Sequence, residues 1–181
     1  MLPTRRSQFQ IQRRPKNDRT GSYWRRIYRV IDSQIEIYWE QFLVAHPEHR
    51  GKPYIAEPFG DNPALADELG NLVLSRVKSA TCSAVWEYEA KGESFPHLGM
   101  LWLVLDGRNK PMCVVETIEV TFRKYNEVDA DFARAEGEDD LTLESWRAGH
   151  KRFFTRTLSL IGKEFTEDMP LVCERFRVIY K

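Results

Sequence analysis

A lysine and a threonine stand three residues apart in the stretch LSRVKSATCSAVWEY, residues 74–88. An amine that loses its proton can act as a base, and a hydroxyl that loses its proton becomes a nucleophile. Lys78 and Thr81 could therefore form an activated nucleophile, with the hydroxyls of Ser79 and Ser83 nearby. The alternative is structural, because a lysine in the last turn of a helix stabilises the helix dipole. Spacing alone favours the structural alternative.

A second polar group lies in AEGEDDLTLESWRAGH, residues 135–150, where acids surround Gly137 just before a predicted helix. A carboxylate such as Glu136 can transfer protons in a reaction. Acids that precede a helix also interact favourably with its positive end. Spacing alone again favours the structural interpretation.

Other chemistries lack the required residues. The sequence contains no glycine-rich nucleotide-binding motif, no zinc deaminase signature and no serine-hydrolase elbow. Cys82, Cys113 and Cys173 form no C-x-x-C pair, so neither a disulfide framework nor a zinc site is indicated. In HPEH, residues 46–49, Pro47 prevents a regular helical register of the two histidines, and His150 falls on an apolar helical stripe. We expect no metal and no cofactor.

The composition predicts one globular domain. The chain has 181 residues, of which 42% are hydrophobic and 30% charged. No apolar run is long enough to span a bilayer, and no apolar segment follows the arginine pair near the start that would complete an export signal. With an odd number of cysteines, we expect a cytoplasmic protein that does not enter a membrane.

The charge is unevenly distributed. The chain has 27 basic and 27 acidic residues, but residues 1–29 hold nine basic residues and one acid, which leaves 18 basic and 26 acidic residues elsewhere. A basic arm on an acidic body could bind phosphates. A solvated tail, or one that docks on the acidic body, is the plainer alternative and remains open.

The pattern of apolar residues divides the chain into a basic arm over 1–20, an amphipathic helix with a connection over 21–55, and a body over 56–181. The prolines and glycines of HPEHRGKPYIAEPFGDNP, residues 46–63, predict a connection over that stretch. The aromatic stripe of the first helix is more typical of packing on the body than of stacking on bases. In the body the sequence predicts a helix that begins at Asn62 and ends near Lys78, an extended segment over 81–88, a hairpin around DGRNKP, a short helix between Asp129 and Gly137, a longer helix from Thr142 and a closing strand over LVCERFRVIY. This order indicates an α+β fold with a largely antiparallel sheet or a small barrel.

Three stretches resemble a known family. FGDNPALADELGNLVLSRVKSATCSAVWEYE, FPHLGMLWLVLDGRNKPMCVVETIEVTF and VDADFARAEGEDDLTLESWRAGHKRFF together resemble the ASCH-domain family, in its larger form with an N-terminal extension. The resemblance covers about residues 57–181. It implies a PUA-like fold, in which helices pack around a small β-barrel, and a relation to domains that bind RNA.

The family signature is a glycine, one residue and a lysine, followed later by an arginine. Lys78 matches the lysine, whereas Arg76 stands at the glycine position and Ser83 at the arginine position. Some small members are amidohydrolases that remove the acetyl group from N4-acetylcytidine with a lysine, a threonine three residues later and a glutamate before the next helix. By motif match, these catalytic residues are Lys78, Thr81 and Glu136.

The resemblance therefore implies a protein that binds RNA or a modified nucleoside. It also implies possible hydrolysis of N4-acetylcytidine, if burial lowers the pKa of Lys78 so that the amine takes the proton of the Thr81 hydroxyl. Arg76, Ser79, Ser83 and Trp86 are the expected ligand-binding residues. One alternative is a single-stranded RNA-binding or ribonuclease module, in which Trp86, Tyr88 and Phe95 stack on bases. Another is a non-catalytic interaction domain whose N-terminal helix binds a partner or a second copy in a homodimer.

Overall fold

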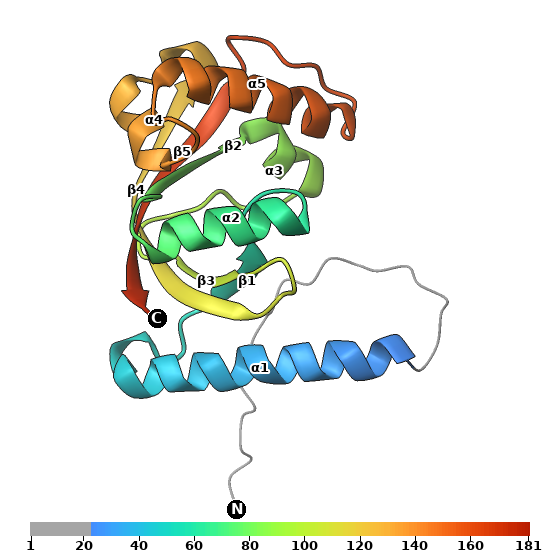
Figure 1. Ribbon diagram of the computed structural model, residues 1–181, viewed down its shortest axis with the longest axis vertical. Coiled ribbons are helices and arrows are strands. Elements are labelled where there is room, and N and C mark those ends of the chain that lie inside the picture. Colours follow the sequence, from blue (N-terminus) through green and yellow to red (C-terminus); the bar gives the residue numbers. More distant parts are fainter. Residues whose placement is uncertain (1–22) are drawn as a thin grey trace, which may run out of the picture.

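The computed structural model describes residues 23–181, with side chains from residue 33 onward, so the predicted basic arm over 1–20 lies outside the described residues. Figure 1 shows the arrangement of the elements. The helices are α1 (Tyr23–Ala45), α2 (Pro63–Leu74), α3 (Val85–Lys91), α4 (Ala130–Glu136) and α5 (Leu143–Ser159), with short 3-10 helices at Pro47–His49 and Tyr125–Glu127. The strands are β1 (Tyr54–Pro58), β2 (Ala80–Ala84), β3 (Leu101–Leu105), β4 (Pro111–Lys124) and β5 (Pro170–Tyr180).

The strands form one curled sheet in the order β1-β3-β4-β5-β2. β1 pairs with β3 in parallel, and the other neighbours are antiparallel. The pairing of β4 with β5 shifts register between Val114 and Val115 and between Thr117 and Glu119. Such bulges increase the local twist of a strand and help a sheet to curl. The result is an α+β half-barrel, which confirms the predicted fold class.

The starts of α2, α4 and α5 were predicted correctly because each of these helices has a capping side chain. The side chain of Asn62 accepts a hydrogen bond from the Leu65 N–H, and the side chains of Asp129 and Thr142 cap α4 and α5 in the same way. The end of α2 differs from the prediction. α2 stops at Leu74, so Lys78 lies in the turn before β2 and not in a last helical turn.

Two other predictions were wrong. Residues 81–88 were predicted to be one extended segment. In the structure β2 ends at Ala84 and α3 follows, because packing of α3 against β2 and β5 overrides the strand propensity of its side chains. The segment 46–63, predicted to be a connection from its prolines, contains β1. β1 is an edge strand of the sheet, where proline is tolerated because one side of the strand needs no ladder hydrogen bonds.

Helices cover both faces of the sheet. The face that we call the α1 face contacts α1 at one end, through Phe42 and Leu103, and contacts α4 and α5 at the other, through Cys82 and Phe132. In Figure 1, α1 and α5 accordingly lie at opposite ends of the molecule. The opposite face, which we call the α2 face, packs against α2 in a cluster of buried residues: Phe59, Leu69, Val73, Val104, Cys113, Val115 and Phe176.

The described part of α1 packs on the body. Trp39, Phe42 and Leu43 are buried against strands β3 and β4, on the face opposite α2. A homodimer through this helix stays a prediction. Among the helices within residues 23–181, none combines the length and the apolar character needed to cross a bilayer.

We predict that Phe42→Ala lowers the free energy of unfolding by about 3–5 kcal/mol, because it removes a fully buried ring. The ring centroid of Phe42 lies 4.8 Å from that of Trp39, 5.3 Å from that of His49 and 5.7 Å from that of Tyr180. Urea unfolding measures the loss. Val44→Ala is the control on the same helix, since Val44 is 75% exposed and should change stability by less than about 0.5 kcal/mol. Equal losses in the two variants would show that α1 does not pack as described.

Candidate functional site

Lys78 is enclosed by two acids. Its side chain is 1% exposed, and its Nζ lies 2.9 Å from Glu136 Oε2 and 2.6 Å from Glu138 Oε1. The same ammonium donates to the backbone carbonyl of Glu136 at 3.3 Å. These three acceptors use all three donors of the ammonium group.

The two carboxylates decide the protonation of this lysine. Burial alone would lower the pKa of Lys78, but the charges of Glu136 and Glu138 outweigh burial and raise that pKa above its ordinary value. The Lys78 ammonium in turn holds the pKa of Glu136 well below its usual range. Lys78 therefore carries its proton, and the expected lowering of its pKa was wrong, while its catalytic role stays a prediction.

Glu136 connects four elements of the fold. Its Oε1 accepts a hydrogen bond from Trp146 Nε1 at 3.2 Å and lies 3.6 Å from His150 Nε2. Burial lowers the pKa of His150, but Glu136 and Glu138 together raise it by more, so the net shift is upward. Burial is the largest cause that raises the pKa of the Cys82 thiol, with Glu136 next. Glu136 thus joins the turn before β2, β2 itself, α4 and α5 in one network.

The ligand atoms of Cys82, Glu136 and His150 lie within 4.8 Å of one another, which is close enough to test for a metal site. The Lys78 ammonium already supplies a positive charge 2.9 Å from the Glu136 carboxylate. The raised pKa of Cys82 also keeps its thiol protonated, whereas a metal ligand must be a thiolate. These residues fit a hydrogen-bond network better than a metal site.

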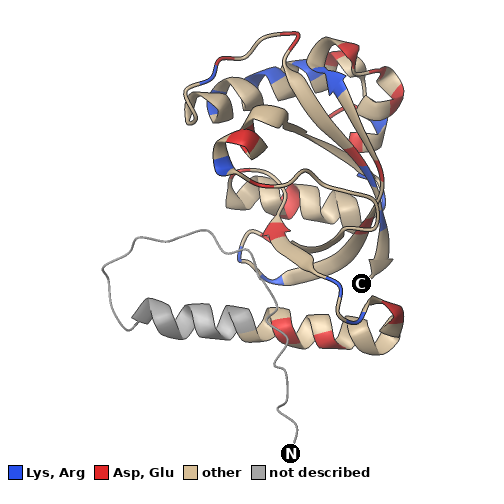
Figure 2. Cartoon of the chain, turned by 180° about the vertical axis from the view of Figure 1, so that it is seen from behind, with Lys and Arg blue, Asp and Glu red and all other residues tan. Residues whose placement is uncertain are grey.

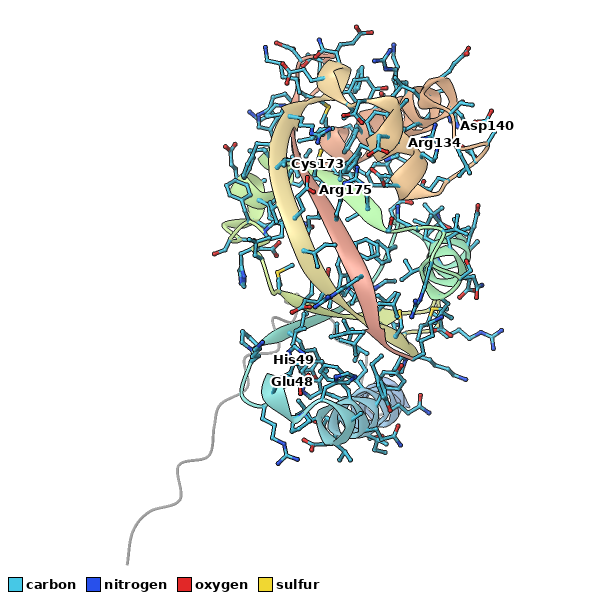
Figure 3. All side chains as sticks on the ribbon, turned by 90° about the vertical axis from the view of Figure 1, so that its left-hand side faces the viewer. Glu48, His49, Arg134, Asp140, Cys173 and Arg175 are labelled. Carbon is cyan, nitrogen blue, oxygen red and sulfur yellow. The ribbon has the colours of Figure 1, made fainter. Side chains whose placement is uncertain are left out.

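A second such group lies between α1 and β1, in HPEH. Pro47 begins a 3-10 helix that brings His46, Glu48 and His49 together, which the sequence analysis did not expect. The Lys52 ammonium lies 3.2 Å from His49 Nδ1, and His49 Nε2 lies 3.7 Å from Glu48 Oε1. Because an ammonium only donates, Nδ1 accepts and Nε2 carries the proton. Figure 3 shows Glu48 and His49 beside the end of α1, where Glu48 is hydrogen-bonded to His46 and His49 to Lys52.

Gly137 lets the acids reach Lys78. Its φ is +75°, and a Cβ at this position would lie 2.7 Å from the Val77 carbonyl oxygen and 2.8 Å from the Lys78 nitrogen. The end of α4 therefore rests directly on the turn between α2 and β2. The Ser79 N–H donates to the Ala135 carbonyl at 2.7 Å and holds this contact. Glu136 and Glu138 flank the glycine in sequence, and both contact Lys78 as a result.

Arg76 adopts a backbone conformation that favours glycine. Its φ is 63°, in the left-handed region, and its side chain is exposed. The family signature has glycine at this position. The sequence therefore departs from the signature in residue type, at a position whose backbone conformation glycine adopts readily.

The α2 face carries a second polar group. Thr81 and Ser83 are half-buried on β2, and Thr81 pairs across the strands with Glu174 of β5. Glu174 is 4% exposed and accepts a hydrogen bond at 3.1 Å from Thr117 Oγ1 of β4. Burial raises the pKa of Glu174 to about 7. The sequence analysis missed this residue, although the period-two pattern of the closing strand places it on the same face as Phe176 and Val178.

Aromatic rings lie on both sides of this polar group. On the side of α2, the Phe59 ring lies 4.3 Å from Trp102 and 5.6 Å from Phe176, between ring centroids. On the side of α3, Phe95 lies 5.3 Å from Tyr88 and 5.2 Å from Phe122. Phe95 and Phe122 are 38% and 58% exposed. The α2 face thus places hydroxyls and a carboxyl between two aromatic groups.

The ionic cluster borders this face. The Lys78 Nζ lies 5.7 Å from the centroid of the Phe59 ring, which is part of the aromatic group beside α2. The Glu138 side chain is 28% exposed, whereas that of Glu136 is 1% exposed. Glu138 is therefore the acid of the cluster that solvent or a ligand can reach. Glu138 was not among the site residues predicted from the sequence.

The structure brings together some of the predicted site residues. Lys78 and Glu136 form an ion pair, and Ser79 lies in the same turn with its side chain bonded to the Ala135 carbonyl. Within residues 33–181, no hydrogen bond joins Lys78 to Thr81. Trp86 lies apart, since it packs against the core under α4 and α5 and has the Lys163 ammonium 5.3 Å from its ring centroid.

Comparison with known proteins identifies the family. The family model of the ASCH domain matches residues 55–180. This chain belongs to the ASCH domain family. The family is generally one of RNA-binding domains.

Two solved structures are similar to this ASCH-domain protein. One is the crystal structure of a protein from Enterococcus faecalis, which is 35% identical, covers 82% of this chain and 89% of its own, and has a TM-score of 0.76. The other is the ASCH domain from Lactobacillus crispatus, also 35% identical, which covers 82% of this chain and 96% of its own with a TM-score of 0.76. A comparison with curated proteins gave no match.

We predict that the buried ion pair is energetically coupled. Lys78→Met should lower the free energy of unfolding by about 3–5 kcal/mol, because it leaves the Glu136 charge buried without a partner. Adding Glu136→Gln should restore part of this loss, so the double variant is more stable than the sum of the single changes by about 1–3 kcal/mol. Urea unfolding of the four proteins measures the coupling.

The exposed pair Arg177 and Glu116, 2.7 Å apart, is the matched control, because the arginine side chain is 65% exposed. The same cycle with Arg177→Met and Glu116→Gln should give a coupling of at most about 1 kcal/mol. Additive losses in the Lys78 and Glu136 cycle would contradict the described network.

Proposed function

We propose that this protein binds single-stranded RNA or a modified nucleoside on the α2 face of its sheet. The observation that carries the proposal is the polar group of Thr81, Ser83 and Glu174 between two sets of aromatic rings. Unpaired bases are recognised by stacking on aromatic side chains and by hydrogen bonds to their edges. The α2 face offers both aromatic rings for stacking and polar side chains for hydrogen bonds.

Cations that could bind phosphates are also available. Figure 2 shows lysines and arginines along α5, and the exposed ones include Arg147, Lys151 and Arg152. The arm over 1–20 contributes six more basic residues and one acid. Because the total charge of the chain is zero, these local groups and not the net charge would attract RNA.

We predict that Phe95→Ser and Phe122→Ser each weaken binding of single-stranded RNA about 5- to 100-fold, since stacking on one aromatic side chain contributes about 1–3 kcal/mol per base. Fluorescence anisotropy with a labelled oligonucleotide at several salt concentrations measures both the affinity and the number of phosphates bound. Val44→Ser, on the solvent-exposed side of α1, is the control for loss of an exposed apolar side chain. The RNA proposal fails if wild type does not bind, or if the Phe95, Phe122 and Val44 variants bind equally well. Cleavage of the oligonucleotide would indicate the ribonuclease alternative.

The ionic cluster favours a second candidate, hydrolysis of an N-acylated nucleoside such as N4-acetylcytidine. Thr81 would supply the nucleophilic oxygen, and Lys78 would hold an acid in place. Since Glu136 is enclosed and Lys78 is protonated, the half-exposed Glu138 is the better group to move protons in this candidate. The roles first given to Lys78 and Glu136 thereby change.

In this candidate reaction the Thr81 oxygen bonds to the acetyl carbon while Glu138 accepts the hydroxyl proton. The carbon–nitrogen bond then breaks, and the proton passes to the departing amine. Water hydrolyses the acetyl ester on Thr81 and releases acetate, which restores the hydroxyl. The positive charge of Lys78, which stands three residues before Thr81 in the sequence, would favour the negative charge that develops on the carbonyl oxygen.

We predict that Thr81→Val lowers turnover of N4-acetylcytidine by at least about 100-fold and leaves the melting temperature within a few degrees, because valine has nearly the shape of threonine but no hydroxyl. Release of cytidine, separated by chromatography, measures turnover. Thr121→Val, which makes the same change on the opposite face of β4, where Thr121 pairs with Cys173, is the control that should retain most activity. If wild type and the Thr81 variant release cytidine at the same rate, Thr81 is not the nucleophile.

A further inference from the structure

Glu174 is a buried acid in the middle of the proposed ligand face. It pairs across the strands with Thr81 of β2 and with Val120 of β4. Its side chain is directed to the α2 face, because Phe176, two residues later on the same strand, packs there against Phe59. Thr117 Oγ1 donates a hydrogen bond to Glu174 Oε2 at 3.1 Å.

No cation compensates this carboxyl. Within the described residues Glu174 forms no ion pair, and the neighbouring Arg175 points to the opposite face, where its guanidinium lies 2.6 Å from Asp131 Oδ2. Figure 3 shows Arg175 and Cys173 together on β5, two residues apart and therefore on the same side of the strand. Glu136, which is equally buried, has Lys78 as its counterion.

The titratable groups that interact with Glu174 do not supply the missing positive charge either. Tyr88 of α3 and Cys173 of β5 have pKa values raised by burial to about 12, so both are neutral at pH 7. The residues of β2 and β4 that lie beside Glu174 are Thr81, Thr117 and Val120, and none of them titrates. A buried carboxyl without a cation favours its neutral form.

A neutral carboxyl group offers one O–H donor and one carbonyl acceptor side by side, whereas a carboxylate only accepts. The pairing edge of cytidine presents a ring nitrogen that accepts and an exocyclic N–H that donates. The two edges are therefore complementary when the acid is protonated. When the acid is ionised, its second oxygen faces the lone pair of the ring nitrogen and repels it.

We propose that Glu174 is the specificity residue of the α2 face and that its neutral carboxyl pairs with the ring nitrogen and exocyclic N–H of a cytidine-type base. The inference rests on the proposed nucleoside-binding function. Because residues paired across antiparallel strands have Cβ atoms about 4.5–5.5 Å apart, Thr81 would lie beside the exocyclic nitrogen of a base bound to Glu174. An acyl group on that nitrogen would then be close to the Thr81 hydroxyl.

The test is calorimetric titration with cytidine, which has the same edge and carries no acyl group to hydrolyse. If binding needs the protonated acid, affinity should fall about tenfold between pH 6 and pH 8, because Glu174 titrates at about 7. Glu174→Gln should bind cytidine with an affinity that is independent of pH in this range, since an amide offers a donor and an acceptor at every pH.

Two controls make the result specific. Glu119→Gln changes an acid on the opposite face of β4, near Arg175, and should keep the wild-type pH dependence. N4,N4-dimethylcytidine lacks the exocyclic N–H and should bind wild type at least about tenfold more weakly than cytidine at pH 6.

The outcomes separate the two proposals. If wild type binds cytidine with the same affinity from pH 6 to pH 8, or if Glu174→Gln keeps the wild-type pH dependence, the role of Glu174 is overturned and nucleoside binding stands. If wild type binds neither cytidine nor RNA at any pH, both proposals are overturned.

Discussion

The contact of Lys78 with Glu136 and Glu138 is the interaction on which the arrangement of this ASCH-domain protein depends. It joins the turn before β2 to the end of α4, and Glu136 extends the connection to α5 through Trp146. Removing one partner would leave a buried charge without compensation, which is far more costly than losing a surface ion pair. The position of β2, and with it of Thr81, is therefore determined by this contact as well as by strand pairing.

Elements with capping residues or a period-two pattern could be predicted from sequence. Asn62, Asp129 and Thr142 cap their helices locally, so the starts of α2, α4 and α5 depend on residues three or four positions away. β1 and α3 could not be predicted, because each depends on pairing or packing with distant segments. The same difference applies to the site: Lys78 stood out by type and spacing, but its protonation depends on acids 58 and 60 residues away.

The family resemblance led to the correct fold, but it did not determine the chemistry of the lysine. Desolvation of Lys78 was foreseen, whereas the second carboxylate that outweighs it was not. Glu138 stands one glycine after Glu136, and only the close approach permitted by Gly137 brings both acids onto one ammonium group. A lysine held in this way keeps its positive charge, because two carboxylates stabilise the ammonium group.

The pKa values of two buried glutamates in this fold are shifted in opposite directions, because their surroundings differ in one respect. Glu136 has an ammonium 2.9 Å away and a pKa well below its ordinary value, while Glu174 has a threonine hydroxyl and a pKa raised to about 7. Ionised Glu136 uses its oxygens to hold the protein together, so neither is free for a ligand. Glu174 has a hydrogen bond to one oxygen only among the described residues, which leaves its other oxygen for a ligand. Glu136, which holds the fold together, therefore has a neighbouring cation, whereas Glu174, the proposed recognition residue, has none. Both side chains are almost fully buried.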